Sequence, residues 1–439
     1  MPHYSFPIGI HKLRVIAPDE RREGKIREED QYRLERSSLL ALREYVPGSQ
    51  LLVGGKLVSS RGLLKHWTGA DLNASMGLRG HYCTCMNDHF YYWVSAPSAG
   101  CPICGAPPKQ APQDLLFPQH GFSSAAWDPP KWSNDVESVG IAETATITFT
   151  QHGSAGTELS KIDFGDVRGL STRYRENGEL LVYNSGGSAK LGELGKGFAI
   201  CLKCGYADSE NDFGKGKIRL PKEFETHAPL TATLPWAICW KNNESPIIRN
   251  QVLAASETTD VLLIDFSACL GAYASNASVV TTLGYALQRA GAQLLELDSR
   301  ELGVLVVPAG EQGFGLGVVL YDSVPGGAGH VRELMDRKRD WLTTARSVMF
   351  VNEAHHARCE TACLNCLLSY SAQMVAAQNL FQRRLAIEVL DALLDERALP
   401  APPAKIPTQT AAHETTLPPL PSNDERLQRA EKRRQGRKS

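Results

Sequence analysis

The fold of the C-terminal half follows from one stretch, Gly317-Val318-Val319-Leu320-Tyr321-Asp322-Ser323-Val324-Pro325-Gly326-Gly327-Ala328-Gly329-His330. Its apolar start predicts a strand that ends at Asp322, and the amphipathic residues 331–341 predict a helix. Backbone N–H groups left unpaired in a glycine-rich turn before a helix form a natural anion site. The stretch therefore predicts phosphate or DNA binding at Gly326, Gly327 and Gly329. A glycine turn required only by tight strand–helix packing stays open as the alternative.

A cysteine cluster, Cys359, Cys363 and Cys366, closes this unit with the spacing C-x-x-x-C-x-x-C. In a chain that shows no secretory signal pattern, thiols at this spacing indicate a metal site more than disulfides. Structural zinc takes four thiolate or imidazole ligands. A fourth ligand is therefore expected, and the candidate is His356 or its neighbour His355. Residues 368–394 follow with a helical pattern.

The segment before this unit alternates between strand and helix patterns. Residues 261–266 are typical of a buried strand, and residues 278–291 predict a helix with small and apolar residues on one face. Residues 294–297 and 302–308 predict two further strands. This alternation favours a partly parallel or mixed sheet covered by helices.

Two other cysteine groups predict zinc in the N-terminal half. The first group consists of Cys83, Cys85, Cys101 and Cys104. Its two pairs flank an aromatic, strand-like run, which is how a zinc ribbon presents four thiolates. The second group consists of Cys201, Cys204, His227 and Cys239. Chance clusters of free buried thiols are the alternative interpretation, but C-x-x-C followed by glycine is a specific pattern.

The rest of the N-terminal half gives weaker signals. Charge dominates the first 36 residues, which predicts an arm that is mobile or docked on a partner. Residues 39–46 predict a short helix, and residues 50–59 predict a hairpin whose turn is Gly54-Gly55. Residues 106–140 predict a long surface connection, and residues 144–200 are β-rich.

These patterns predict a mixed α+β chain, with a zinc-ribbon and β-rich N-terminal half and an α/β C-terminal domain that carries a cysteine metal cluster. The expected parts are a charged arm (1–38), a helix–hairpin and zinc-ribbon module (39–140), a β-rich zinc-binding region (141–258), an α/β domain with the PGGAG loop (259–397) and a disordered basic tail (398–439). In the tail, Arg433 and Arg434 are candidate phosphate contacts, although a solvated tail is the commoner explanation.

Composition limits the partners of the chain. With 47 basic and 48 acidic residues the net charge is −1, so any DNA binding must come from a local basic patch. The sequence has no apolar run long enough to span a bilayer and no signal-peptide pattern. We therefore expect a cytoplasmic protein that does not bind membranes.

Three segments together resemble a known family. They are Leu42-Arg43-Glu44-Tyr45-Val46-Pro47-Gly48, residues 197–205, and residues 321–329 with the later Cys363-Leu364-Asn365-Cys366. Over most of residues 39–394 the chain is similar to the zinc-binding domain of unknown function at the C-terminal end of MrfA-type superfamily 2 helicases. The same domain occurs in DrmB, the helicase-associated subunit of DISARM anti-phage defence. The resemblance implies a partner that supports a DNA-translocating helicase in phage defence or DNA repair.

The chain lacks the sequence of an ATP-driven motor. Its Gly-Lys-Gly triplets, residues 195–197 and 214–216, do not have the frame of a phosphate loop. We therefore expect a non-catalytic, zinc-binding accessory subunit that binds a superfamily 2 helicase and DNA. The beginning of the chain also resembles the tail of a helicase polypeptide, so a separately encoded C-terminal half of a split helicase fits as well.

Two enzymatic or ligand-binding alternatives remain at this stage. A metal-dependent nuclease would use the strand-end acids Asp265, Glu296, Asp298 and Asp322, because carboxylates there can hold Mg²⁺. A nucleotide-binding protein would use residues 325–330 as a phosphate loop. Scattered acids at strand ends are more often helix caps or solvated loop residues, so the accessory-subunit interpretation is preferred.

Overall fold

The computed structural model describes most of the first 401 residues. The described ranges are 9–29, 31–65, 76–87, 90–94, 100–102, 104–132, 167, 169–186, 196–210, 224, 226–240, 246–309, 315–369, 372, 375–376 and 379–401, with the backbone alone at 142–146 and 161–163. Residues 1–400 form one unit and residues 401–439 another. Arg433 and Arg434, predicted above to contact phosphate, lie outside the described residues.

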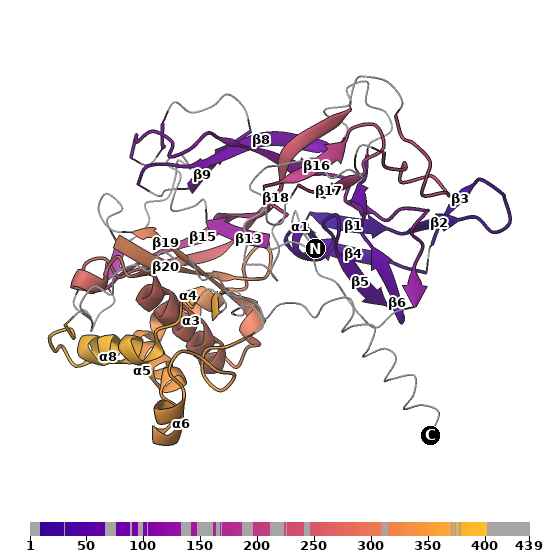
Figure 1. Ribbon diagram of the computed structural model, residues 1–439. Helices are drawn as coiled ribbons and strands as arrows, with labels where there is room; N and C mark the ends of the chain where they lie inside the picture. Colours follow the sequence, from indigo (N-terminus) through magenta and orange to yellow (C-terminus); the bar gives the residue numbers. More distant parts are fainter. Residues whose placement is uncertain are drawn as a thin grey trace, which may run out of the picture. The chain divides into compact units, whose positions relative to one another are not determined.

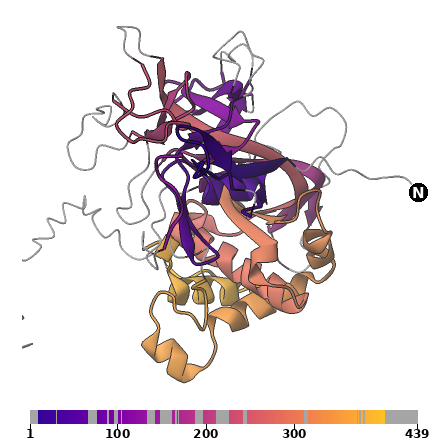
Figure 2. The ribbon, with the colours of Figure 1, turned by 90° about the vertical axis from the view of Figure 1, so that its right-hand side faces the viewer.

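The longest strand, β18 (Ile247–Asp265), is the axis of the described fold. It pairs along most of its length with β15 (Ser171–Asn184), in antiparallel register from Asn184↔Leu253 to Ser171↔Asp265. Its N-terminal part also pairs with β16 (Phe198–Cys201), and its C-terminal part with β20 (Gly315–Asp322). Figures 1 and 2 show this strand passing from the N-terminal strands to the helices of the C-terminal part. The boundary expected between residues 258 and 259 therefore falls inside a continuous strand.

The remaining strands of this sheet extend it on both sides. The order is β13-β15-β18-β10-β8-β9, with β14, β16, β17, β19 and β20 attached off this path. Their bounds are β8 (Gly77–Thr84), β9 (Phe90–Trp93), β10 (Gln113–Pro118), β13 (Ala142–Thr146), β14 (Lys161–Asp163), β17 (Ala207–Ser209) and β19 (Leu302–Ala309). β10 runs parallel to β18, and the other pairs described in this sheet are antiparallel. The predicted mixed α+β class is confirmed, but the described strands after residue 260 pair only antiparallel, so the partly parallel sheet expected there is wrong. Residues 113–118, expected in a surface connection, are instead an inner strand of the sheet.

Helices cover one face of the C-terminal strands. They are η1 (Gly271–Tyr273), α3 (Ala277–Leu294), η2 (Ser299–Glu301), α4 (His330–Asp336), α5 (Lys338–Met349), α6 (Glu353–Arg358) and α8 (Arg383–Leu394). Alternate residues of β18 and β20, such as Ile264 and Leu320, pack in one core with Leu283 of α3. At Gly284 a Cβ atom would lie 3.1 Å from Val318, so α3 approaches the sheet closely. None of the helices in the described part of the chain is long and apolar enough to cross a membrane.

Two predicted elements of this part are wrong. Residues 294–297 are not a strand: α3 continues to Leu294, and Glu296 then takes a φ of 56° in a turn. The helix predicted over residues 368–394 is not continuous in the described residues, and its C-terminal part is α8. Before it, Asn379 has a φ of 55°, a left-handed conformation that breaks a helix.

Much of the predicted charged arm (residues 1–38) folds as strands instead, and its first eight residues lie outside the described residues. The strands are β1 (Ile10–Arg14), β2 (Ile16–Pro18), β3 (Ile26–Glu28) and β4 (Leu34–Ser37). β1 and β4 join β7 (Gly62–Leu63) and β11 (Phe122–Ser123) in a four-stranded sheet. Leu13 is 1% exposed. Its neighbours form ion pairs with Glu28, with 2.8 Å between Lys12 Nζ and Oε1 and 2.9 Å between Arg14 Nε and Oε2. The alternation of apolar and charged residues is a strand pattern that the high charge content obscured.

The predicted helix and hairpin that follow are confirmed. The helix is α1 (Ser38–Glu44), and the hairpin pairs β5 (Gln50–Val53) with β6 (Lys56–Ser59). Gly54 and Gly55 have φ values of 57° and 80°, as a primed two-residue turn requires. The short strand β12 (Lys131–Trp132) pairs with β6.

Candidate metal centres

Four predicted ligands meet beside the end of β16, in what we call the central group: Cys201, Cys204, His227 and Cys239. Cys201 is the last residue of β16, and its carbonyl oxygen accepts from Gly205 N at 2.8 Å to close a tight turn. Gly205 takes a φ of 87°, which favours glycine. The Sγ atoms of Cys201 and Cys239 are 4.0 Å apart, and Cys204 Sγ lies 3.3 Å from His227 Nε2.

These separations fit a tetrahedral zinc site. Zinc–sulfur bonds of about 2.3 Å at tetrahedral angles place two sulfurs about 3.8 Å apart and a sulfur and an imidazole nitrogen slightly closer. Cys201 is fully buried, and His227 and Cys239 are each 5% exposed. Four soft donors gathered in a buried position are the ligand set of structural zinc rather than of Mg²⁺ or Ca²⁺.

The ring of His227 is held with one nitrogen facing the thiols. Its Nδ1 lies 2.7 Å from the carbonyl oxygen of Phe224, to which an Nδ1–H donates. The ring also stacks on Tyr206, with ring centroids 4.8 Å apart. Burial lowers the pKa of His227, but hydrogen bonds to Cys201 and Cys239 outweigh it and raise the pKa to about 10. A carbonyl partner on Nδ1 is the usual support for a histidine that ligates metal through Nε2.

A histidine joins the three C-terminal cysteines, so the C-terminal group has four possible metal ligands. It consists of His355, Cys359, Cys363 and Cys366. His355 Nε2 lies 3.3 Å from Cys363 Sγ, and Cys366 Sγ lies 3.9 Å from Cys359 Sγ and 3.7 Å from Cys363 Sγ. The helix α6, capped by Asn352, carries His355, and Cys359 follows directly at its C-cap.

His355, and not the favoured candidate His356, belongs to this group. The ring of His356 lies over Phe350, with centroids 5.1 Å apart, and its Nδ1 is 3.4 Å from an Arg383 nitrogen. The two histidines are adjacent on α6 and so point in different directions: the ring of His355 faces Cys363, whereas that of His356 faces Phe350 and Arg383.

A buried arginine that sequence reasoning missed supports the C-terminal group. Arg383 is 0% exposed, and its guanidinium donates to the carbonyl oxygens of Met349 at 2.8 Å, His356 at 3.3 Å and Cys359. Three thiolates, a neutral imidazole and a divalent cation together carry one negative charge. A buried cation beside them compensates that charge, whereas an uncompensated buried guanidinium would be costly. Arg383 thus fits a charged tri-thiolate site.

The N-terminal group brings together three of its four predicted thiols, Cys85, Cys101 and Cys104. Cys85 Sγ and Cys104 Sγ are 3.8 Å apart. Cys83, two residues before Cys85, forms a hydrogen bond with the Tyr91 side chain instead. Burial raises the pKa of the Cys83 thiol. Among the described residues no further histidine, cysteine or carboxylate joins the three thiols. The group therefore differs from the expected zinc ribbon by the exclusion of Cys83.

The glycine loop turns its donors inward, so it is not the anion site that we expected. Asp322 Oδ2 accepts from Ala328 N at 2.8 Å and His330 N at 3.0 Å, and Asp322 Oδ1 accepts from Val331 N at 3.1 Å. Gly326 N donates to the carbonyl oxygen of Thr258 at 2.8 Å. The carboxylate of Asp322, 1% exposed, occupies the position that a phosphate would take.

Gly327 is required by close packing. Its φ is +79°, and a Cβ atom there would lie 2.5 Å from Asp260 Cγ. Asp260 is 6% exposed, and its pKa is raised by burial and by the neighbouring charge of Asp322. These contacts support the packing alternative for the loop rather than ligand binding at Gly326, Gly327 and Gly329.

The strand-end acids of the nuclease alternative do not converge. β18 and β20 are antiparallel, and Asp265 pairs with Gly317, five residues from Asp322. At about 3.3 Å per residue the two acids are about 17 Å apart along the sheet. Asp298 caps η2 by accepting from Arg300 N. None of these acids joins a ligand group in the described part of the chain.

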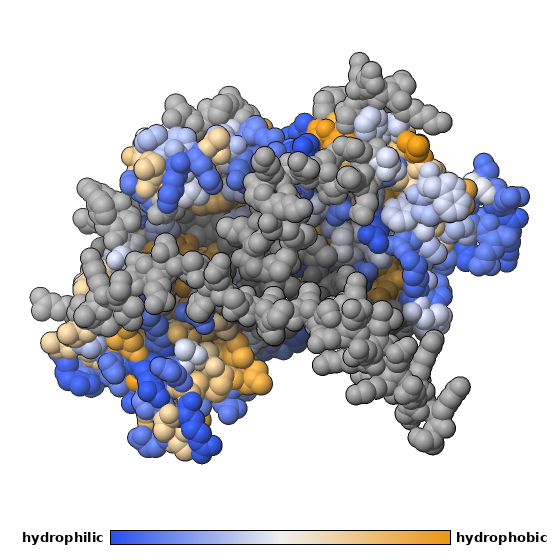
Figure 3. Space-filling view, viewed as in Figure 1, coloured by the Kyte–Doolittle hydropathy of each residue, from blue (hydrophilic) through white to orange (hydrophobic). Residues whose placement is uncertain are grey.

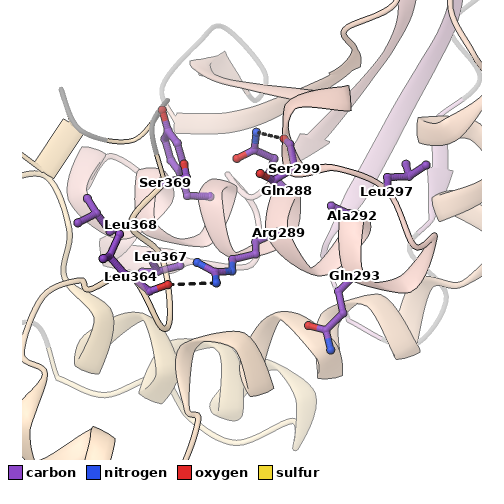
Figure 4. A pocket seen from close by; sticks show the side chains of 11 residues that line it. Gln288, Arg289, Ala292, Gln293, Leu297, Ser299, Leu364, Leu367, Leu368 and Ser369 are labelled. Atoms are coloured by element: carbon purple, nitrogen blue, oxygen red, sulfur yellow. Dashed lines mark hydrogen bonds between the residues drawn. The ribbon is translucent and has the colours of Figure 1, made fainter.

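A shallow hollow of about 390 Å³ lies next to the C-terminal group, between α3 and residues 364–369. Figure 4 shows Arg289 reaching from α3 toward Leu364, whose carbonyl oxygen accepts from Arg289 Nη2 at 3.2 Å. Leu364 and Leu367, which line it, directly follow the ligands Cys363 and Cys366. The hollow therefore shares one wall with the C-terminal group.

Comparison with known proteins places a named domain in the same region. Residues 283–367 match the family model of the MrfA Zn-binding domain. This match contains the whole C-terminal group and the glycine loop, and it excludes the other two groups. This part of the chain is thus similar to a zinc-binding domain named after MrfA.

The chain is also similar to longer proteins. Over 416 residues it is 24% identical to the Druantia protein DruE of Escherichia coli (strain UMEA 4076-1), a match that covers 89% of this chain and 21% of that protein. The chain thus spans about a fifth of the length of this curated relative.

Two solved structures of one helicase are similar at a low level. A crystal structure of the DUF1998 helicase MrfA bound to DNA has a TM-score of 0.35 and 12% identity, over 87% of this chain and 34% of that one. The same helicase bound to DNA and AMPPNP has a TM-score of 0.30 and 10% identity, over 87% and 31%. These TM-scores do not establish a shared overall fold.

Proposed function

We propose, from the premise that residues 283–367 are a helicase-associated zinc-binding domain, that this chain is a non-catalytic accessory module of a DNA helicase. It holds zinc at the central and C-terminal groups, binds a superfamily 2 motor polypeptide and contributes to its DNA path. Its role lies in anti-phage defence or in DNA repair.

The observation that carries this proposal is the C-terminal group itself. The four ligand atoms of His355, Cys359, Cys363 and Cys366 lie within 4.8 Å of one another, inside or at the edge of a domain known for zinc binding. Structural zinc contributes folding free energy directly, because its site does not exist in the unfolded chain. A zinc ion held by these four residues would stabilise the module, and with four protein ligands it would have no open position for a substrate.

Two features support a non-catalytic role. Three N–H groups of the glycine loop and of the helix start that follows it donate to Asp322, so they do not face a nucleotide phosphate. The sequence also lacks a Walker A motif. ATP-driven work would then come from another polypeptide or another part of a longer protein. The length of the relative DruE, about five times the matched segment, is consistent with such a division.

For the pathway we propose only a broad class, anti-phage defence. Resemblance to the DISARM subunit DrmB and the match to a Druantia protein both support anti-phage defence over a housekeeping role. Of these two systems, the match favours a Druantia-like setting over the DISARM-like one that the sequence suggested. Localisation in the cytoplasm would follow from either setting.

The test is ATP hydrolysis in the presence of DNA, measured with the purified chain, the helicase encoded in the same gene cluster, and their mixture. We expect no turnover by the chain alone and a higher DNA-stimulated rate, or tighter DNA binding, in the mixture. A motor with its Walker A lysine replaced controls for the source of the activity. Robust turnover by the chain alone would overturn the proposal.

A further inference from the structure

Three large hydrophobic side chains stand in solvent on one loop between two ligands of the central group. Leu234 is 47% exposed, Trp236 is 73% exposed and Ile238 is 51% exposed. Among the described residues, no other five-residue window holds more than one large hydrophobic side chain that is exposed. Figure 3 shows hydrophobic residues at the surface at the upper right, where Figure 1 draws the segment between β17 and β18.

The base of this loop is firmly held. His227 and Cys239 are both ligands of the central group, and Cys239 N donates to the carbonyl oxygen of His227 at 3.1 Å. Lys203 Nζ donates to the carbonyl oxygen of Cys239 at 2.7 Å. Leu230 is 4% exposed, and its carbonyl oxygen accepts from Ala126 N at 2.8 Å. Both ends of the loop that carries the apolar side chains are therefore hydrogen-bonded to the rest of the fold.

The loop carries no charge. Residues 228–240 contain no lysine, arginine, aspartate or glutamate, although such residues make up 22% of the chain. Binding to nucleic acid depends mainly on cations that neutralise phosphates. A loop of leucine, tryptophan and isoleucine without cations matches an apolar protein surface better than a phosphate backbone.

We propose that Leu234, Trp236 and Ile238 insert into an apolar socket on the helicase motor polypeptide. This inference rests on the proposed function and names the surface by which the accessory module docks. The relative DruE is about five times longer than the matched region, so in that protein the corresponding region has extensive neighbouring protein to contact. Tryptophan at the centre of a small apolar patch is the residue type that most often dominates interface affinity.

The test compares two exposed tryptophans. Trp236→Ser removes the central side chain of the loop, and Trp132→Ser, at a residue 75% exposed on β12, is the matched control. Binding of each full-length variant to the purified helicase of the same gene cluster is measured by calorimetry. Zinc content and thermal unfolding are measured on the same samples, and Leu234→Ser provides a second, milder variant.

We expect Trp236→Ser to weaken binding by about thirty-fold or more, the range of an interface hot spot, with zinc content unchanged. Trp132→Ser should bind like the wild type. Equal binding of Trp236→Ser and wild type would overturn the docking inference and leave the proposed function intact. Failure of the wild type to bind the helicase would instead overturn the proposed function and, with it, this inference.

Two other outcomes would assign the loop to a different partner and so refute the inference. In one, Trp236→Ser binds the helicase normally but loses affinity for a fluorescent 20-nucleotide single strand, which would indicate base stacking. In the other, it binds the helicase normally but changes from dimer to monomer in light scattering, which would indicate a second copy of this chain.

Discussion

Replacing Asp322 with alanine should destabilise the C-terminal part by about 3–5 kcal/mol. The carboxylate accepts three backbone hydrogen bonds at 2.8, 3.0 and 3.1 Å and is 1% exposed. A hydrogen bond to a charged group contributes about 1.5–3 kcal/mol, and an unsatisfied buried donor costs about 1–3 kcal/mol. The three hydrogen bonds share one carboxylate, so their contributions do not simply add. We therefore expect a loss of unfolding free energy near the upper end of the range seen for single substitutions.

The assay is urea unfolding followed by circular dichroism, with two controls. Asp322→Asn keeps one side-chain oxygen as acceptor, so it should lose roughly half as much stability. Asp260→Asn should be neutral or stabilising, because the pKa of Asp260 is raised by burial and by the charge of Asp322. An Asp322→Ala protein within about 0.5 kcal/mol of the wild type would refute the reasoning. So would strong stabilisation of the wild type by millimolar phosphate, because the loop would then bind an external anion.

Three further predictions concern the C-terminal group and one buried acid. His355→Ala should lower bound zinc by about one ion per chain after mild chelation, while His356→Ala should retain it, as measured by elemental analysis. Arg383→Met should weaken zinc retention by about 10- to 100-fold in chelator competition, because the ligand loop loses its buried donor; unchanged retention would contradict this role. Burial raises the pKa of Glu257 to about 7, so the wild type should lose stability as pH rises from 4.5 through 7. Glu257→Gln should therefore gain thermal stability relative to the wild type over that interval, and a pH-independent difference would count against it.

The sequence predicted most of the C-terminal elements because their signals are local. The apolar runs 261–266 and 318–321 predict strands whichever neighbours they pair with, and both are strands in the structure. The pair Gly54-Gly55 predicts a tight turn by itself, because both residues can take a positive φ. Prediction from sequence failed where charge obscured an alternating pattern, as at Lys12, Leu13 and Arg14 in β1.

The candidate sites show the same limit. Cysteine spacing located the three groups, since metal ligands cluster in sequence. The choice between His355 and His356 could not be made from spacing, because the two lie four and three residues before Cys359 and both separations bring helical residues close. The roles of Asp322 and Arg383 could not be predicted, because each depends on partners that only the folded chain brings near. A glycine loop whose N–H groups donate to a carboxylate of the same chain has the same sequence pattern as a loop that binds phosphate.

The measurement that tests the account most directly is the zinc content of the purified full-length chain, together with its stability after chelation. The central and C-terminal groups each supply four ligands, so we predict at least two zinc ions per chain and loss of cooperative unfolding when they are removed. Cys201→Ser and Cys363→Ser should each reduce the content by about one ion or prevent soluble folding. Less than one zinc ion per chain, in a protein that unfolds cooperatively and is indifferent to chelator, would contradict the account.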